Sequence, residues 1–131
     1  MRRSDRVSVG LVHGGGRERV GKRGTERRHM SVRLGIHGNT LCVDGVKELS
    51  AANANAFRDQ IRIALTDSLR NIEIDLSAAT FLDSCGLGAL ISLHKTACGR
   101  NGLVRLINPA PPVQQILELT RMHRIFEIVR V

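Results

Sequence analysis

Asp83 and Ser84 are the adjacent residues of this sequence whose side chains are most clearly able to take part in chemistry. They stand between an apolar run and a predicted helix, in the stretch Phe81 to Leu90, which reads FLDSCGLGAL. A serine hydroxyl at such a point has three possible roles: it can cap the helix, attack a substrate as a nucleophile, or carry a covalent modification. The rest of the chain determines which of these roles is favoured.

A catalytic role for Ser84 is disfavoured because no base is placed to activate it. A nucleophilic serine needs a base, most often histidine, and an acid that orients the base. In the periodic part of the chain, His37 is predicted in a turn and His94 lies two to three turns along the same helix as Ser84. His123 lies near the end of the sequence. Leu82 also stands where the G-x-S-x-G elbow of hydrolases has glycine. We therefore expect a protein that is not an enzyme.

A capping role is the simplest interpretation of the Asp-Ser pair. Either Asp83 or Ser84 can accept a hydrogen bond from the free backbone N–H groups of the first helical turn. Gly86 and Gly88 oppose the helix, because each glycine costs about 1 kcal/mol relative to alanine. We interpret that cost as a sign that the backbone is left bare for the close approach of a partner surface.

Other segments match part of a known site motif but lack a residue or a spacing that the site requires. Residues 16–22 match the phosphate-loop pattern G-x-x-x-x-G-K, but Arg23 replaces the Ser or Thr that would hold magnesium. Residues 13–16, His-Gly-Gly-Gly, are similar to an esterase oxyanion loop without the serine elbow that such enzymes need. The cysteines lack the spacing of a zinc site or of a disulfide framework: Cys42, Cys85 and Cys98. We expect free thiols in the cytoplasm, and neither a metal nor a cofactor.

The composition fits one globular domain preceded by a basic segment. The chain has 131 residues, of which 42% are hydrophobic, and contains neither a membrane-spanning run nor a secretory signal. Residues 1–31 hold nine Lys or Arg and three Asp or Glu, so most of the net charge of +8 lies there. We predict a disordered basic tail over residues 1–30 and a folded domain over residues 31–131. With no Trp or Tyr, nucleic-acid binding is not expected except through the tail.

Hydrophobic periodicity predicts an α/β fold in the order β-β-α-β-α-β-α. The predicted elements are a hairpin over 32–43 with its turn at Gly38 and Asn39, a helix of about five turns capped by Ser50 and reaching Leu69, a strand over 72–76, a helix over 84–98 ended by Gly99, a strand over 103–107, a helix starting at Pro111, and an edge strand over 126–131. Strands separated by single amphipathic helices form a mixed, mostly parallel sheet with right-handed crossovers.

Several of these segments, in this order, resemble the STAS-domain anti-sigma factor antagonists. The similar segments are Ile72 to Ser77, FLDSCGLGAL, Leu103 to Pro109, Ile116 to Thr120 and Ile125 to Ile128. The resemblance covers residues 32–131 and implies a STAS fold. It also implies that Ser84, in an Asp-Ser-x-Gly motif, is phosphorylated by an anti-sigma factor that is an ATP-dependent serine kinase. The unmodified protein would sequester that kinase and free a sigma factor to start transcription, and a serine phosphatase would reset the switch.

The resemblance further implies a partner-binding surface around the serine. Its expected members are Asp83, Cys85, Gly86, Leu87, Gly88, Glu48 and Asn108. Glu48 stands nearest to an acidic residue that is typical of the family, with Asp44 as the second candidate. Cys85 is either a small packing residue or a thiol that the helix N-terminus makes oxidisable. The alternative function is that of a STAS module without phosphorylation, acting as a scaffold or a transporter-associated subunit.

Overall fold

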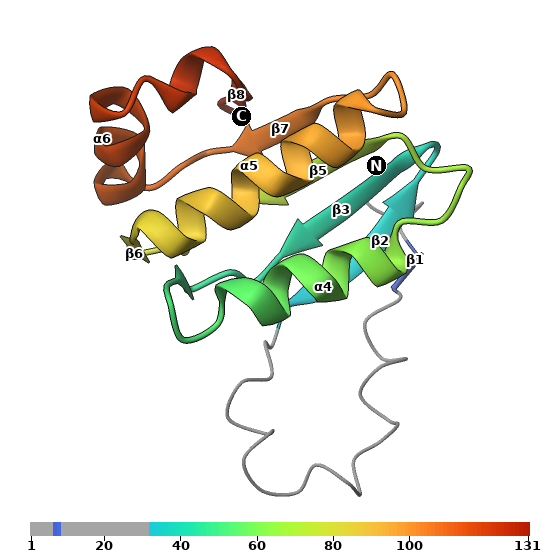
Figure 1. Ribbon diagram of the computed structural model, residues 1–131, viewed down its shortest axis with the longest axis horizontal. Helices are drawn as coiled ribbons and strands as arrows, with labels where there is room; N and C mark the ends of the chain where they lie inside the picture. The colour runs from blue at the N-terminus through green and yellow to red at the C-terminus, as the bar shows by residue number, and fades with distance from the viewer. Residues whose placement is uncertain (1–6, 9–31) are drawn as a thin grey trace, which may run out of the picture.

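The computed structural model describes residues 7–8 and 32–131 of the chain (Figure 1). Its elements are β1 (Val7–Ser8), β2 (Arg33–His37), β3 (Thr40–Asp44), β4 (Glu48–Leu49), α4 (Ala54–Ala64), β5 (Asn71–Asp75), β6 (Phe81–Leu82), α5 (Ser84–Cys98), β7 (Val104–Ile107), α6 (Pro111–Leu119), the 3₁₀ helix η2 (Met122–Arg124) and β8 (Glu127–Val129). No helix in this part of the chain has the length and apolar character needed to cross a membrane.

The main sheet has six strands in the order β1-β2-β3-β5-β7-β8. Strands β1, β2 and β3 pair antiparallel, and β3, β5, β7 and β8 pair parallel. The turn between β2 and β3 uses Gly38 with a φ of 64°, a left-handed conformation that glycine adopts without steric cost. The predicted hairpin and the mixed, mostly parallel α/β sheet are therefore confirmed.

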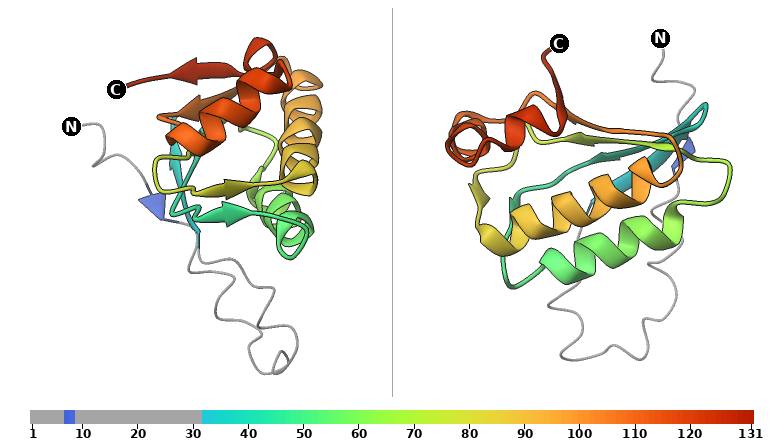
Figure 2. Two further views of the ribbon diagram at one scale, coloured as in Figure 1. Left: turned by 90° about the vertical axis from the view of Figure 1, so that its left-hand side faces the viewer. Right: turned by 45° about the horizontal axis from the view of Figure 1, so that its top comes forward.

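Helices α4 and α5 lie on the same face of this sheet, as both views of Figure 2 show. The core between them and the sheet consists of fully buried side chains: Phe57, Ile61, Leu90, Leu93, Leu41, Ile72, Ile74 and Leu106. Alternating residues of each strand supply this face because successive strand side chains point in opposite directions. Helix α6 lies at the end of the sheet, where it contacts β6.

The first helix is shorter than the sequence predicts. It begins at Ala54 after Asn53, rather than at a Ser50 cap, and it ends at Ala64. The backbone carbonyl of Ser50 accepts hydrogen bonds from the N–H groups of Asn53 and Ala54, so the chain makes a separate turn first. Leu65 and Leu69 continue the apolar pattern and are buried, but they lie in the loop that follows the helix.

The Arg100 guanidinium holds that loop in a non-helical conformation. It donates hydrogen bonds to the backbone carbonyls of Leu65, Thr66 and Leu69, at distances of 2.6 to 3.2 Å. These carbonyls would otherwise continue a helix or face water. A charged side chain more than thirty residues away thus stabilises the loop in which the predicted helix is interrupted. This contact cannot be inferred from a local sequence pattern.

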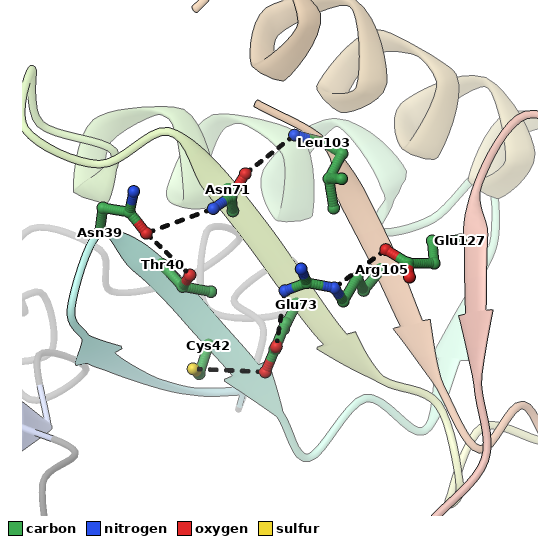
Figure 3. A network of polar contacts seen from close by, with 8 residues as sticks. All are labelled: Asn39, Thr40, Cys42, Asn71, Glu73, Leu103, Arg105 and Glu127. Atoms are coloured by element: carbon green, nitrogen blue, oxygen red, sulfur yellow. Dashed lines mark hydrogen bonds and ion pairs between the residues drawn. The ribbon is translucent and has the colours of Figure 1, made fainter. Parts of the chain in front are cut away.

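The face of the main sheet opposite the two helices carries a polar network (Figure 3). Arg105 on β7 donates hydrogen bonds to Glu73 on β5 at 3.1 Å and to Glu127 on β8 at 3.0 Å. Cys42 on β3 lies 3.8 Å from the other Glu73 oxygen. Four adjacent strands are therefore linked by side chains as well as by their backbone ladders.

A second sheet of two short strands was not predicted. Strands β4 and β6 pair parallel, with Glu48 opposite Phe81 and Leu49 opposite Leu82. Strands of two residues contain too few positions to show a period, so only the folded chain reveals them. This small sheet leads directly into α5.

Part of the predicted tail is described by the structure. Val7–Ser8 form β1, which pairs with Gly35 and Ile36 of β2. The remaining tail residues lie outside the described residues, and so do the two glycine-rich runs at 13–16 and 16–22.

Candidate functional site

Ser84 is the first residue of α5 and is exposed. The residue before it, Asp83, is the N-cap: its Oδ1 accepts hydrogen bonds from the backbone N–H groups of Cys85 at 2.9 Å and Gly86 at 3.0 Å. Within the described part of the chain, the Ser84 hydroxyl makes no hydrogen bond. Asp83 therefore performs the capping, and the neighbouring hydroxyl is left available for chemistry.

Asp83 also fastens the turn that precedes α4. Its Oδ2 accepts a hydrogen bond from the backbone N–H of Ala51 at 3.0 Å, and its own N–H donates to the Leu49 carbonyl at 3.1 Å. The N–H of Gly86, followed by those of Ala51 and Cys85, holds the pKa of Asp83 below its ordinary value, although burial acts in the opposite direction. The carboxylate is therefore ionised at neutral pH and points at the helix N-terminus, where a negative charge is favourable.

Gly86 is buried against β4 and is not part of an exposed patch. A Cβ at this position would overlap the carbonyl oxygen of Leu49 and would lie 2.6 Å from the Leu49 Cβ. The glycine is therefore required for close packing of α5 on the small sheet. The expectation that Gly86 leaves its backbone bare for a partner is wrong for this reason.

Gly88 and Cys85 are exposed on α5, whereas Leu87 is half-buried and packs against the core. A Cβ on Gly88 would meet no atom within 4 Å. The three cysteines, all among the described residues, form no disulfide, and only Cys42 is buried. Of the predicted glycine pair, one glycine therefore serves packing and the other faces open space.

Glu48 is the acidic residue that the fold places in the small sheet leading to Ser84. It lies on β4 opposite Phe81, and its carboxylate accepts a hydrogen bond from the Ser50 hydroxyl at 3.4 Å. Asp44, the second candidate, lies at the end of β3 and forms an ion pair with Arg33 at 2.9 Å. This arrangement favours Glu48 as the acidic residue of the candidate site.

Asn108 serves the C-terminal segment of the chain. Its φ of 49° is unusual for a residue other than glycine. Its backbone N–H donates to the Val129 carbonyl at 2.8 Å, and its side-chain oxygen accepts from the N–H of Val131 at 2.9 Å. These hydrogen bonds fix the loop after β7 to the end of the chain, so the structure assigns Asn108 a structural contact and does not link it to Ser84.

Phe81 is the residue near Ser84 that sequence reasoning missed. It is 50% exposed on β6, directly before buried Leu82 and capping Asp83. Its position three residues before the serine is visible in the sequence, but its exposure depends on the β4–β6 pairing.

His94 and His123 have other partners. The His94 ring lies edge-on to Phe126, with 5.6 Å between ring centroids, and 3.5 Å from the Cys98 sulfur. His123 Nδ1 lies 3.4 Å from the Leu117 carbonyl. In the described ranges no histidine is hydrogen-bonded to Ser84, and no three His, Cys, Asp or Glu side chains are grouped to hold a metal ion. Among the described residues, Ser84 is therefore an exposed hydroxyl to which no histidine is bonded.

Comparison with known proteins identifies a family over the whole folded part. A family model described as the STAS domain matches residues 31–131. A STAS-domain containing protein of Pseudomonas aeruginosa is 40% identical over 73 residues, covering 55% of this chain and 70% of the relative. A protein of Thermotoga maritima, provisionally named an anti-sigma factor antagonist, is 30% identical over 83 residues, covering 63% of this chain and 74% of the relative.

Solved structures share the fold. The anti-sigma factor antagonist SpoIIAA in its unphosphorylated form superposes with a TM-score of 0.67 at 18% identity, covering 77% of this chain and 88% of that chain. SpoIIAA, described as a Bacillus cell fate determinant, also has a structure in the phosphorylated form, with a TM-score of 0.62 at 17% identity over 77% of this chain and 91% of that chain. At these identities the likeness shows the fold alone.

Proposed function

The chain belongs to the STAS-domain family of anti-sigma factor antagonists, and from this premise we propose that it binds an anti-sigma factor serine kinase and so releases a sigma factor. Phosphorylation of Ser84 by that kinase would end the binding, and a serine phosphatase would restore it. The proposal assigns a binding role rather than catalysis, in the cytoplasm, where ATP and the transcription machinery are found.

The observation that carries the proposal is the position of Ser84. Its hydroxyl is exposed on the first residue of α5, and the cap beside it is already supplied by Asp83. A kinase can therefore modify Ser84 without removing a hydrogen bond that holds the helix. The phosphorylated and unphosphorylated forms of SpoIIAA, which has the same fold, offer a precedent for modification in that protein.

The charge of a phosphate explains how such a switch would act. A phosphoserine adds about −1.5 to −2 charges at neutral pH, together with three acceptor oxygens. At a helix N-terminus this charge is tolerated within the protein itself. In a closed interface the phosphate loses its water, and this loss costs binding free energy unless cations of the partner compensate for it. We expect release to come from the interface, with the fold of this chain intact.

The first test is phosphorylation in vitro. The purified chain is incubated with its cognate anti-sigma factor kinase and ATP, followed by intact-mass measurement and peptide mapping. We expect one added phosphate, located on Ser84, and none on the Ser84→Ala variant. Ser68→Ala, which removes another exposed serine in the loop after α4, is the matched control and should be modified like the wild type. Phosphate at another residue, or none at all, would refute the switch.

The second test is binding of the kinase. Ser84→Ala should bind as the wild type does, whereas Ser84→Glu should lose binding and retain the wild-type circular dichroism spectrum. A Ser84→Glu variant that binds as tightly as wild type would contradict the proposal. The scaffold or transporter-associated alternative predicts no phosphate transfer and partner binding that is indifferent to the charge at residue 84.

A further inference from the structure

Phe81 is the one exposed aromatic ring among the Phe, Trp and Tyr residues of this chain. The sequence contains three Phe and neither Trp nor Tyr. Phe57 is fully buried and Phe126 is 4% exposed, whereas Phe81 is 50% exposed. Aromatic rings supply large contact areas and are enriched at the energetically dominant positions of protein interfaces. A sequence so poor in aromatic residues places one of its three on the surface, three positions before Ser84.

The small sheet fixes the outward direction of this ring. Phe81 pairs with Glu48, and the next residue, Leu82, pairs with Leu49 and is 3% exposed. Successive side chains of a strand point to opposite sides, so burial of Leu82 directs Phe81 away from the core. Asp83 then caps α5, which fixes the residues that separate the ring from Ser84.

The distance from Phe81 to Ser84 is short on the scale of an interface. Three residues span at most about 11 Å between Cα atoms, even when fully extended. A standard interface covers about 800 Å² of each partner, which corresponds to a disc of roughly 16 Å radius. An interface of this size centred on Ser84 would therefore extend as far as Phe81.

We propose that Phe81 is the apolar residue that anchors this chain to its anti-sigma factor. While Ser84 is unphosphorylated, the Phe81 ring inserts into an apolar pocket of the anti-sigma factor. This inference rests on the proposed function and names the residue that supplies affinity at the same site. Ser84 then controls the complex, and Phe81 provides much of the binding free energy that the phosphate must overcome.

The surface around Phe81 combines the exposed carboxylate of Glu48, its partner across the small sheet, with several small uncharged residues. The small exposed residues in the same structural unit are Ala51 and Ala52, in the turn held by Asp83, and Ser84, Cys85 and Gly88 on α5. Short side chains allow the partner backbone to approach and exclude water around a central ring. A phosphate on Ser84 would add its charge to this surface beside the Asp83 carboxylate, and removing that charge from water on binding would cost free energy.

The test measures the dissociation constant of the full chain with its cognate anti-sigma factor by calorimetry. Phe81→Ala should weaken binding about 10- to 100-fold, the range for loss of a central aromatic contact. Phe81→Leu keeps part of the apolar volume and should lose less. The matched control is Ile63→Ala, which removes an exposed apolar side chain from α4, 82% exposed, and should change the constant less than about twofold.

The two proposals fail in different ways. If wild-type protein neither binds the kinase nor accepts phosphate, the proposed function is wrong. If wild type binds, Ser84→Glu does not, and Phe81→Ala binds as wild type does, the Phe81 inference alone is overturned. Should Phe81→Ala unfold, hydrogen exchange on the wild-type complex decides: protection of the backbone amides of residues 80–82 on binding supports the anchor, and unchanged exchange there overturns it.

Discussion

The Asp83 carboxylate accepts a hydrogen bond from the backbone N–H of Ala51 at 3.0 Å, joining residues that are 32 positions apart. The other oxygen of the same carboxylate caps α5 through Cys85 and Gly86. One side chain therefore sets the relative position of two segments that flank Ser84.

Replacing Asp83 with alanine should loosen both segments at once. Three backbone N–H groups lose their acceptor, and N-cap loss is a recognised cause of destabilisation. We expect a lower melting temperature and faster hydrogen exchange at the amides of Ala51, Cys85 and Gly86, measured by NMR. Asp67→Ala, at an exposed loop position, is the control and should leave these amides unchanged. Unchanged exchange at Ala51 in Asp83→Ala would contradict the tether.

Stability should depend on the ionisation of Asp83 in acid. The pKa of Asp83 in the folded chain lies below its ordinary value of 3.8, so the unfolded chain takes up the proton first as the pH falls. Its contribution is thus fully present above the ordinary pKa and is lost as the pH drops through the folded-state pKa.

The measurement compares the melting temperatures of wild type and Asp83→Asn between about pH 6 and about pH 2. The advantage of wild type at the upper end of this range should shrink towards the lower end. A constant difference across the range would show that ionisation of Asp83 makes no contribution.

The two glycines of α5 should respond to alanine in opposite directions. Gly86→Ala forces a Cβ against the Leu49 backbone and should destabilise the fold by about 1–3 kcal/mol, as overpacking does. Gly88→Ala adds a methyl group in open space and should stabilise the helix by about 0.5–1 kcal/mol. Urea unfolding measures both free energies, and effects of the same sign would refute the distinction.

Arg105 should matter little to stability despite its two carboxylate partners. Its side chain and that of Glu73 are about one-third exposed, and Glu127 is half exposed. Ion pairs in such positions contribute about 0–1 kcal/mol. We expect Arg105→Met to change the free energy of unfolding by less than about 1 kcal/mol, with a difference that diminishes at high salt. A loss of several kcal/mol would mean that the network holds the strands together.

Ser84→Glu should fold normally even though it is expected to lose its partner. A negative charge on the first residue of a helix is favourable, while the neighbouring Asp83 carboxylate repels it. Because the position is exposed, we expect the free energy of unfolding to stay within about 0.5 kcal/mol of wild type, measured by urea titration at neutral pH. Marked destabilisation would make loss of partner binding by this variant uninformative.

Local signals predicted much of the fold. The helix over 84–98 was predicted with both of its ends, because the Asp-Ser pair and Gly99 are start and stop signals that a local sequence pattern contains. The hairpin at Gly38 was predicted for the same reason. The choice of Ser84 as the residue to be modified depended on a family resemblance over several segments in order, in which the Asp-Ser-x-Gly motif contains the serine.

Contacts between distant segments could not be predicted in this way. The contact of Gly86 with Leu49, the Arg100 bonds to the loop after α4, and the pairing of β4 with β6 each join positions more than thirty residues apart. From the sequence alone, the cost of Gly86 is therefore interpreted as room for a partner, and Phe81 is an ordinary apolar residue. Only the folded chain shows that the first is packed and the second exposed.

The small β4–β6 sheet also has a consequence for when the protein can be recognised. Its two strands, like Ala51 and Asp83, come from separate parts of the chain with α4 and β5 between them, so they meet only in the folded chain. The surface around Ser84 is therefore absent from a nascent or misfolded chain, whose serine is merely part of a flexible peptide. A kinase that recognises this surface would act only on folded molecules. The amount of protein available for phosphorylation would then follow the concentration of folded protein rather than the total concentration.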